Sequence, residues 1–149
     1  MSGRKTNIAL LIVYSALMVW LLFDRAGYVA GVPYWEQVSQ QLNLVPFRTL
    51  RLFINLLDSG VRSYILMAVI NLAGNVILFI PLGFLLPRVF PWCDSLLRQI
   101  FITAAIITTV EILQLFTLVG SCDIDDLILN VIGSTFGFLI HKHAKKPAP

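Results

Sequence analysis

The residue most able to do chemistry in this sequence is a carboxylate inside an apolar stretch. Glu111 lies within residues 100–119, and Gln114 follows three positions later, so both side chains share one face of a helix. A carboxylate at membrane depth is costly unless it is paired, hydrated or protonated. We therefore expect Glu111 to face other polar groups, where it can bind a ligand or exchange a proton.

Two other apolar segments carry polar residues at helical spacing. Asn71 and Asn75 are one turn apart in residues 63–86. A stripe along residues 124–140 consists of Asp126, Asn130, Gly133 and Gly137. The amides fit hydrogen-bonding glue between helices as well as they fit ligand contacts, and both interpretations stay open. The two glycines favour close helix packing over ligand contact.

Acidic residues gather just before the last apolar segment. Asp123, Asp125 and Asp126 could cap a helix start, because acidic side chains favour that end. Capping is the preferred interpretation for Asp123. Oxygen ligands of this kind could alternatively hold Mg²⁺.

The composition excludes a soluble domain. The chain has 149 residues, of which 58% are hydrophobic and 13% charged, whereas globular domains carry about 25% charged residues. Its net charge of +3 comes from scattered basic residues, so nucleic acid is not an expected partner. Cys93 and Cys122 have no spacing or neighbours that would build a metal site or a disulfide framework.

The apolar blocks predict an all-α integral membrane protein with about four transmembrane helices. These blocks are residues 8–23, 63–86, 100–119 and 124–140. The first has the basic start of a signal peptide, but its length and the missing small-residue cleavage site favour a retained anchor. We predict one membrane domain over 1–149, with a basic, disordered tail at 142–149.

An additional amphipathic helix is predicted over residues 46–57. Arg48, Arg51 and Asn55 recur at i, i+3 and i+7, with an apolar set on another face. With Pro46 near its start, this helix should lie in the headgroup region or re-enter the membrane.

Basic residues predict the orientation. Four spans with a cytoplasmic N-terminus place seven of the 11 basic residues inside: Arg4, Lys5, Arg88, Arg98, Lys142, Lys145 and Lys146. Both termini are then cytoplasmic. At about 1.5 Å per residue, the polar groups of all three spans fall in the outer half of the membrane. We therefore expect an outward-facing polar cavity beneath the helix that carries Arg48.

Several motifs in order resemble the VanZ-like family. They are Pro46-Phe47-Arg48-Thr49, Asn71, Gly74-Asn75 with the Phe79–Pro87 run, Glu111-Ile-Leu-Gln114, and Asp123-Ile-Asp125-Asp126 with Asn130, Gly133 and Gly137. The resemblance covers about residues 45–140. Many members carry an arginine shortly before the acidic run, and this chain has none there. The resemblance implies a protein of the bacterial cytoplasmic membrane linked to resistance to teicoplanin, and it supplies no reaction.

The residues favour a binding protein over an enzyme. In the leading hypothesis a lipid or lipid-linked envelope precursor is bound by polar side chains that include a cation from the interfacial helix: Arg48, Asn71, Asn75, Glu111, Gln114, Asp123, Asp126 and Asn130. Teicoplanin-type drugs act on the outer face, so a protein there could change their access. The alternative is an enzyme on a lipid-linked substrate, with Glu111 and Asp126 as acid and base or as metal ligands. No cofactor motif or nucleophile motif accompanies them.

A third hypothesis is proton or solute transport. A single buried carboxylate would then act as the relay, and four helices would need oligomerisation to form a pathway. A homo-oligomer through Gly133 and Gly137 is the contact that this hypothesis predicts.

Overall fold

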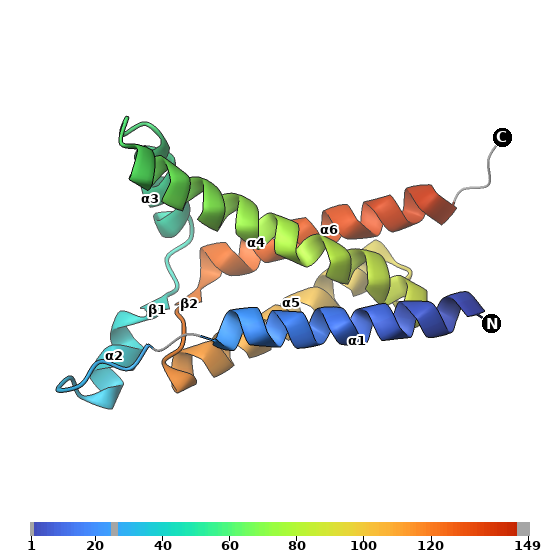
Figure 1. The fold of residues 1–149 in the computed structure, drawn as a ribbon, viewed down its shortest axis with the longest axis horizontal. Coiled ribbons are helices and arrows are strands. Elements are labelled where there is room, and N and C mark those ends of the chain that lie inside the picture. Colours follow the sequence, from blue (N-terminus) through green and yellow to red (C-terminus); the bar gives the residue numbers. More distant parts are fainter. Residues whose placement is uncertain (1, 25–26, 146–149) are drawn as a thin grey trace.

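Six helices and one short strand pair make up the computed structural model, which describes residues 2–24 and 27–145 (Figure 1). The elements in chain order are α1 (Ser2–Phe23), α2 (Tyr34–Gln40), β1 (Leu42–Asn43), α3 (Arg48–Leu57), α4 (Arg62–Val89), the 3-10 turn η1 (Pro91–Cys93), α5 (Leu96–Thr117), β2 (Cys122–Asp123) and α6 (Ile124–Lys145).

Four of the helices are long and apolar enough to cross a membrane, namely α1, α4, α5 and α6. This confirms the predicted fold class, and α3 confirms the helix predicted over 46–57. The tail prediction is wrong for residues 142–145, because α6 continues to Lys145. Lys142 and Lys145 both bind Asp94 and hold this last turn in place. Residues 146–149 lie outside the described residues.

The two ends of the bundle differ in structure. The start of α1 and the end of α6 lie at one end, while α2, α3, β1 and β2 gather at the other (Figure 1). The helix α2 and the strand pair were not predicted from the sequence. They bring the long connection between α1 and α4 against the start of α6, and this arrangement creates the site described below.

The crossing of α4 and α6 depends on glycine. A Cβ atom on Gly137 would lie 1.9 Å from the carbonyl oxygen of Ile80, and one on Gly133 would lie 2.0 Å from that of Val76. The backbone of α4 cannot move aside to relieve such contacts, so only glycine allows α4 and α6 to pack this closely. The close-packing interpretation of these glycines is therefore confirmed. Because α4 of the same chain covers both glycines, a second copy cannot reach them in this arrangement.

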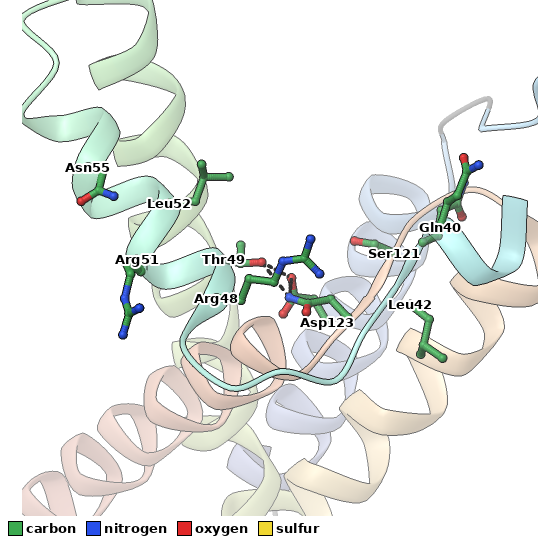
Figure 2. A pocket seen from close by; sticks show the side chains of 11 residues that line it. Gln40, Leu42, Arg48, Thr49, Arg51, Leu52, Asn55, Ser121 and Asp123 are labelled. Atoms are coloured by element: carbon green, nitrogen blue, oxygen red, sulfur yellow. Dashed lines mark hydrogen bonds between the residues drawn. The ribbon is translucent and has the colours of Figure 1, made fainter.

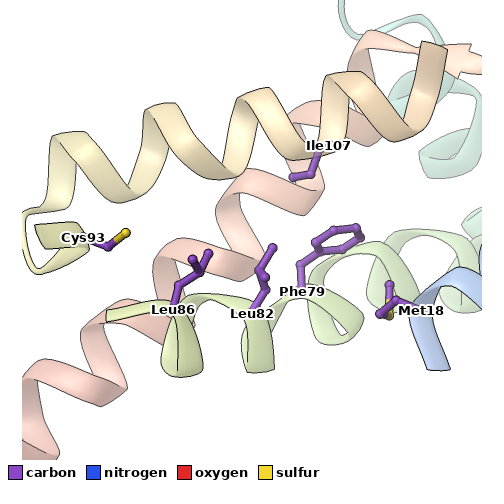
Figure 3. Packing of buried hydrophobic residues seen from close by; sticks show 6 residues of the cluster. All are labelled: Met18, Phe79, Leu82, Leu86, Cys93 and Ile107. Carbon is purple, nitrogen blue, oxygen red and sulfur yellow. The ribbon is translucent and has the colours of Figure 1, made fainter. Parts of the chain in front are cut away.

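The apolar core follows one side of α4. Phe79, Leu82 and Leu86 pack with Ile107 of α5, and Met18 of α1 and Cys93 of η1 complete the cluster (Figure 3). The helix α4 also packs against α6, so it contacts α1, α5 and α6 at once. Its central place explains why it sets the relative positions of the polar residues on its neighbours.

Hydrogen bonds tie α1 to the bundle along its length. The hydroxyl of Tyr14 donates to the carbonyl of Leu78 at 2.9 Å. Near the other end of the helix, Gln114 Nε2 donates to the carbonyl of Leu22 at 2.9 Å. These contacts integrate α1 into the bundle.

A buried polar contact that the sequence did not single out joins α5 to α6. Gln99 Nε2 donates to Thr103 Oγ1 at 3.2 Å and to Ser134 Oγ at 3.1 Å, and the two hydroxyls lie 2.9 Å apart. All three side chains are buried. These hydrogen bonds satisfy side-chain donors that lipid could not. The cluster therefore stabilises the packing of α5 against α6, as expected for amides in helix bundles.

Candidate functional site

A polar pocket of about 550 Å³ lies at the end of the bundle where the short elements gather (Figure 2). Its walls come from the end of α2, from β1, from the polar face of α3 and from the segment that enters α6. Its polar lining consists of Gln40, Gln41, Asn43, Arg48, Thr49, Arg51, Asn55, Ser121 and Asp123. The pocket is open, which suits a headgroup or another polar molecule approaching from outside the bundle.

The strand pair brings two distant segments together at this pocket. Leu42 pairs with Cys122 and Asn43 with Asp123, in parallel register. The N–H of Cys122 also donates to the carbonyl of Gln41 at 2.9 Å. This pairing sets Asn43 beside the acidic run, although about eighty residues separate them in the sequence.

Asp123 connects the pieces of the pocket wall. Its Oδ2 accepts hydrogen bonds from the hydroxyl of Thr49 and from Asn43 Nδ2, the latter at 3.1 Å. Its Oδ1 accepts the N–H of Asp125 at 2.8 Å, which caps the start of α6. The capping interpretation is therefore confirmed, but Asp123 is buried and also joins α6 to α3.

Glu111 supports this wall from behind. Its Oε2 accepts the backbone N–H of Asp123 at 3.2 Å, and its side chain is buried. The predicted burial of Glu111 among polar groups is confirmed. Among the described residues Arg48 forms no ion pair with Glu111. Glu111 thus positions the pocket backbone, and its direct contact with a ligand stays a prediction.

Asp125 holds α3 in place, a role the sequence did not reveal. Its Oδ1 accepts the N–H of Phe47 at 2.6 Å and its Oδ2 accepts the N–H of Leu50 at 3.0 Å. These are free amides at the start of α3, where a carboxylate is favoured. Phe47 has φ 64°, a strained conformation for a bulky residue, and the contact with Asp125 maintains it.

The basic face of α3 lines the pocket as its spacing predicted. Arg48, Arg51 and Asn55 all contribute to the lining, and Figure 2 shows the Arg48 side chain extending towards Asp123. In the part of the chain that the structure describes, neither arginine forms an ion pair. The pocket therefore offers two guanidinium groups that are available to an anion.

The remaining predicted residues lie deeper in the bundle. Asn75 Nδ2 donates to Asp126 Oδ1 at 2.6 Å, which joins α4 to α6. Gln114 binds the carbonyl of Leu22. The Oδ1 atoms of Asn71 and Asn130 are buried without a hydrogen-bond partner among the described residues. Of the predicted ligand residues, the structure places Arg48 and Asp123 on the pocket and the other six behind it.

The carboxylates of Asp123 and Asp125 are already engaged within the protein. The carboxylate oxygens of Asp123 and Asp125 already accept N–H and O–H groups, which a cation would displace. No group of three or more metal-ligating side chains is found in residues 2–24 and 27–145. Burial and the neighbouring Glu111 and Asp123 carboxylates raise the pKa of the Cys122 thiol, which disfavours its nucleophilic thiolate form.

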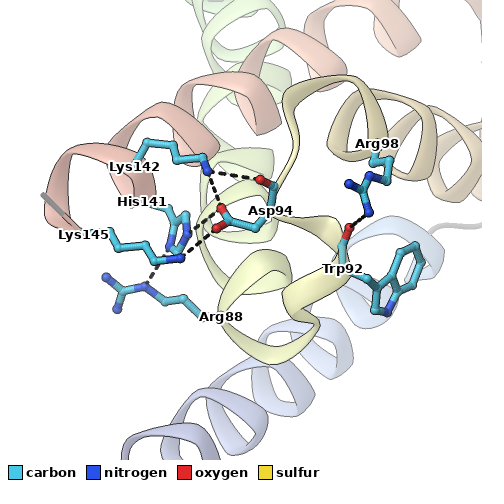
Figure 4. A network of polar contacts seen from close by, with 7 residues as sticks. All are labelled: Arg88, Trp92, Asp94, Arg98, His141, Lys142 and Lys145. Atoms are coloured by element: carbon cyan, nitrogen blue, oxygen red, sulfur yellow. Dashed lines mark hydrogen bonds and ion pairs between the residues drawn. The ribbon is translucent and has the colours of Figure 1, made fainter.

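A second polar cluster lies at the opposite end of the bundle (Figure 4). Asp94, just after η1, pairs with Lys142 and Lys145 at 2.7 Å each and with His141 Nε2 at 3.3 Å. Hydrogen bonds from Lys142 and from Lys145 hold the pKa of the Asp94 carboxyl well below its usual range. The cluster fastens the last turns of α6 to the α4–α5 connection.

Replacing Asp94 by asparagine should lower thermal stability at neutral pH, and by progressively less as the pH falls below the unfolded pKa of aspartate. A carboxyl whose pKa is depressed by folding stabilises the folded state above its unfolded pKa of about 3.9. That stability is lost as the pH falls through the lower folded pKa. Unfolding midpoints of both proteins in detergent, measured from neutral pH to below pH 4, test this. An equal difference at every pH would contradict it.

The fold and the pocket together define a multi-pass helical membrane protein with an arginine-bearing polar pocket at one end. The family model described as VanZ/LLP1 matches residues 11–145, and the chain belongs to this family. It is 29% identical over 145 residues to Protein VanZ of Enterococcus faecium, a match that covers 97% of this chain and 78% of that protein. No solved structure matches the chain. The resemblance inferred from the sequence motifs is thus confirmed.

Proposed function

We propose that this protein binds the anionic headgroup of a lipid or lipid-linked envelope precursor and thereby modulates susceptibility to teicoplanin. The observation that carries the proposal is the pair of arginines, Arg48 and Arg51, which line a polar pocket without an ion-pair partner in the described chain. Membership of the VanZ/LLP1 family supports the link to teicoplanin.

The chemistry of the pocket fits a phosphate flanked by hydroxyl groups. Guanidinium groups bind phosphate through paired N–H donors. Asn55 and Ser121 offer neutral donors and acceptors on the same pocket. The Asp123 carboxylate can accept a hydrogen bond from a ligand hydroxyl, but it repels additional negative charge on the ligand. This combination favours a glycerol or sugar phosphate over a polyanion.

The proposed location is the bacterial cytoplasmic membrane, with both termini in the cytoplasm and the pocket outside. The end that holds the described termini carries Arg4, Lys5, Arg88, Arg98, Lys142 and Lys145, whereas the pocket end carries Arg48, Arg51 and Arg62. Basic residues prefer the cytoplasmic side. A pocket on the outer face would meet the envelope precursors among which teicoplanin acts.

The double variant Arg48→Gln/Arg51→Gln should lose teicoplanin protection while remaining in the membrane. Each hydrogen bond from a charged group contributes about 1.5–3 kcal/mol. Loss of both guanidinium groups should therefore weaken headgroup binding by about tenfold or more. The measurement is the inhibitory concentration of teicoplanin, with vancomycin for comparison, in a Gram-positive host at matched membrane levels. The wild type should protect selectively against teicoplanin.

Arg62→Gln is the matched control. Arg62 lies at the same end of the bundle, at the start of α4, and does not line the pocket. It removes one of the positive charges at this end of the bundle without touching the pocket, so it should protect as the wild type does. Full protection by the double variant would show that the pocket is not the site.

A further inference from the structure

A second pocket, of about 380 Å³, lies at the end of the bundle opposite Arg48. It is bounded by α1, the end of α4, η1 and the end of α6. The charged and polar residues on it are Arg88, Asp94, His141, Lys145 and Asn7. None of them belongs to the site proposed above. The stabilising role of Asp94 does not explain why Arg88 lines this pocket without an ion-pair partner among the described residues.

Arg88 is fixed in place by two neighbours. Its Nε–H donates to His141 Nδ1 at 3.4 Å, and its guanidinium carbon lies 3.8 Å from the centre of the Phe84 ring. Because Nδ1 of His141 accepts this bond, Nε2 carries the hydrogen and can donate to Asp94 Oδ1 at 3.3 Å. The hydrogen bonds from Arg88 to His141 and from His141 to Asp94 thus fix the position of the Arg88 side chain. The contact with the Phe84 ring fixes the orientation of its guanidinium plane.

The terminal amino groups of Arg88 remain available. Among the described residues Arg88 forms no ion pair, and Figure 4 shows its guanidinium end directed away from Asp94. A planar fork held in this way is suited to two parallel hydrogen bonds with a phosphate group.

The balance of charge around this pocket is positive. Asp94 is the acidic residue of the cluster, and it is already paired with Lys142 and Lys145 at 2.7 Å each. His141 is neutral while it accepts from Arg88. Arg88 therefore adds a positive charge that no carboxylate of the cluster offsets, and Lys145 lies on the pocket with it.

We infer that this pocket binds the phosphate headgroup of an anionic phospholipid. A lipid is the expected source of the phosphate, because the pocket lies where the spanning helix α1 begins and the spanning helices α4 and α6 end. Phe90 and Trp92, which flank the lining residue Pro91 in the sequence, are 40% and 58% exposed, as aromatic side chains are at a membrane interface. Basic pockets between transmembrane helices characteristically take anionic headgroups.

Purified protein in nanodiscs tests the inference. The midpoint of thermal unfolding is compared between discs of phosphatidylcholine alone and discs that also contain phosphatidylglycerol. Native mass spectrometry counts the phosphatidylglycerol molecules retained. The wild type should unfold at a higher temperature with phosphatidylglycerol, because a ligand that binds the folded state stabilises it. Arg88→Gln should lose this increment, with an apparent affinity lower by about tenfold or more.

Arg98→Gln is the matched control. Arg98 lies at the same end and donates to the carbonyl of Trp92 at 2.9 Å, but it does not line the pocket. This variant removes one basic charge from the same face and should keep the full phosphatidylglycerol increment. If Arg88→Gln does not fold, Arg88→Lys replaces it and should show a reduced increment, because an ammonium lacks the planar fork.

Three results would overturn the inference. One is an Arg88 variant that is destabilised equally in both kinds of disc and keeps the wild-type increment, which would make Arg88 a structural residue only. Another is an equal loss of the increment in Arg98→Gln, which would indicate nonspecific surface charge. The third is the same stabilisation by inorganic phosphate in phosphatidylcholine discs, which would make the site one for soluble phosphate. Each result is independent of teicoplanin susceptibility.

Discussion

Replacing Asp125 by alanine should abolish protection against teicoplanin, although the four spanning helices should still assemble. Asp125 is 2% exposed and accepts the N–H groups of Phe47 and Leu50 at 2.6 and 3.0 Å. These bonds fasten the start of α3, and hence Arg48, to the first turn of α6. Alanine leaves both amides without their acceptor and releases the helix that forms one wall of the pocket.

The expected size of this effect follows from the charge and the strain involved. A hydrogen bond to a charged group contributes about 1.5–3 kcal/mol. The left-handed conformation of Phe47, at φ 64°, costs about 1–3 kcal/mol in the folded protein. Without the contact to Asp125, this strain favours release of the start of α3. Once Asp125 is gone, Phe47 should relax, and Arg48 and Arg51 should lose their place on the pocket wall.

Two measurements separate the local effect from global unfolding. Hydrogen exchange of the α3 amides should become faster in Asp125→Ala, while the exchange of α4, α5 and α6 should be unchanged. Teicoplanin protection at matched membrane levels should fall to that of cells without the protein. Asp125→Asn keeps an oxygen acceptor and should be intermediate.

Asp58→Ala serves as the control for α3. Asp58 lies at the other end of that helix and is exposed. Its replacement should leave both the exchange of the α3 amides and the protection unchanged. Protected amides in Asp125→Ala would show that the carboxylate does not hold the helix. If Asp125→Ala cells lose their teicoplanin protection but the α3 amides do not exchange faster, the effect on function does not come from release of α3.

Features that depend on neighbours along the chain were predictable. Hydropathy identified the four spans, because a membrane requires a continuous apolar length. The spacing of Arg48, Arg51 and Asn55 identified the face of α3 that lines the pocket. Helix ends were less predictable, because tertiary contacts decide them. The pairing of Lys145 with Asp94, for example, extends α6 beyond the predicted end.

Features that depend on distant segments were not predictable. Asp125 was interpreted as part of a cap of its own helix, but it binds amides 75 and 78 residues away. Periodicity carries no information about such a contact, and the strand pair between Asn43 and Asp123 is equally nonlocal. Glu111 was recognised as needing polar surroundings. Its partner is a backbone N–H, a group that nearly every residue has, so no residue type marked it.

Gly137→Leu should cause the largest loss of stability among these variants. The Cβ atom would lie 1.9 Å from the carbonyl oxygen of Ile80 and 2.9 Å from the N atom of Phe84. Both are backbone atoms of α4, so α4 and α6 must separate along their crossing. Forced overpacking of this kind costs about 3 kcal/mol or more. The thermal midpoint in detergent should fall sharply, and less protein should reach the membrane fraction.

Gly74→Ala isolates this steric argument from the general effect of glycine in a helix. A Cβ atom on Gly74 meets nothing within 4 Å, and this glycine also belongs to a spanning helix, α4. Alanine there should therefore preserve or raise stability, because alanine has the higher helix propensity by about 1 kcal/mol. A normal midpoint for Gly137→Leu would mean that the two helices do not approach closely at Gly137. Equal losses in both variants would instead attribute the effect to the helix backbone, and the close crossing of α4 and α6 would no longer explain why residue 137 is a glycine.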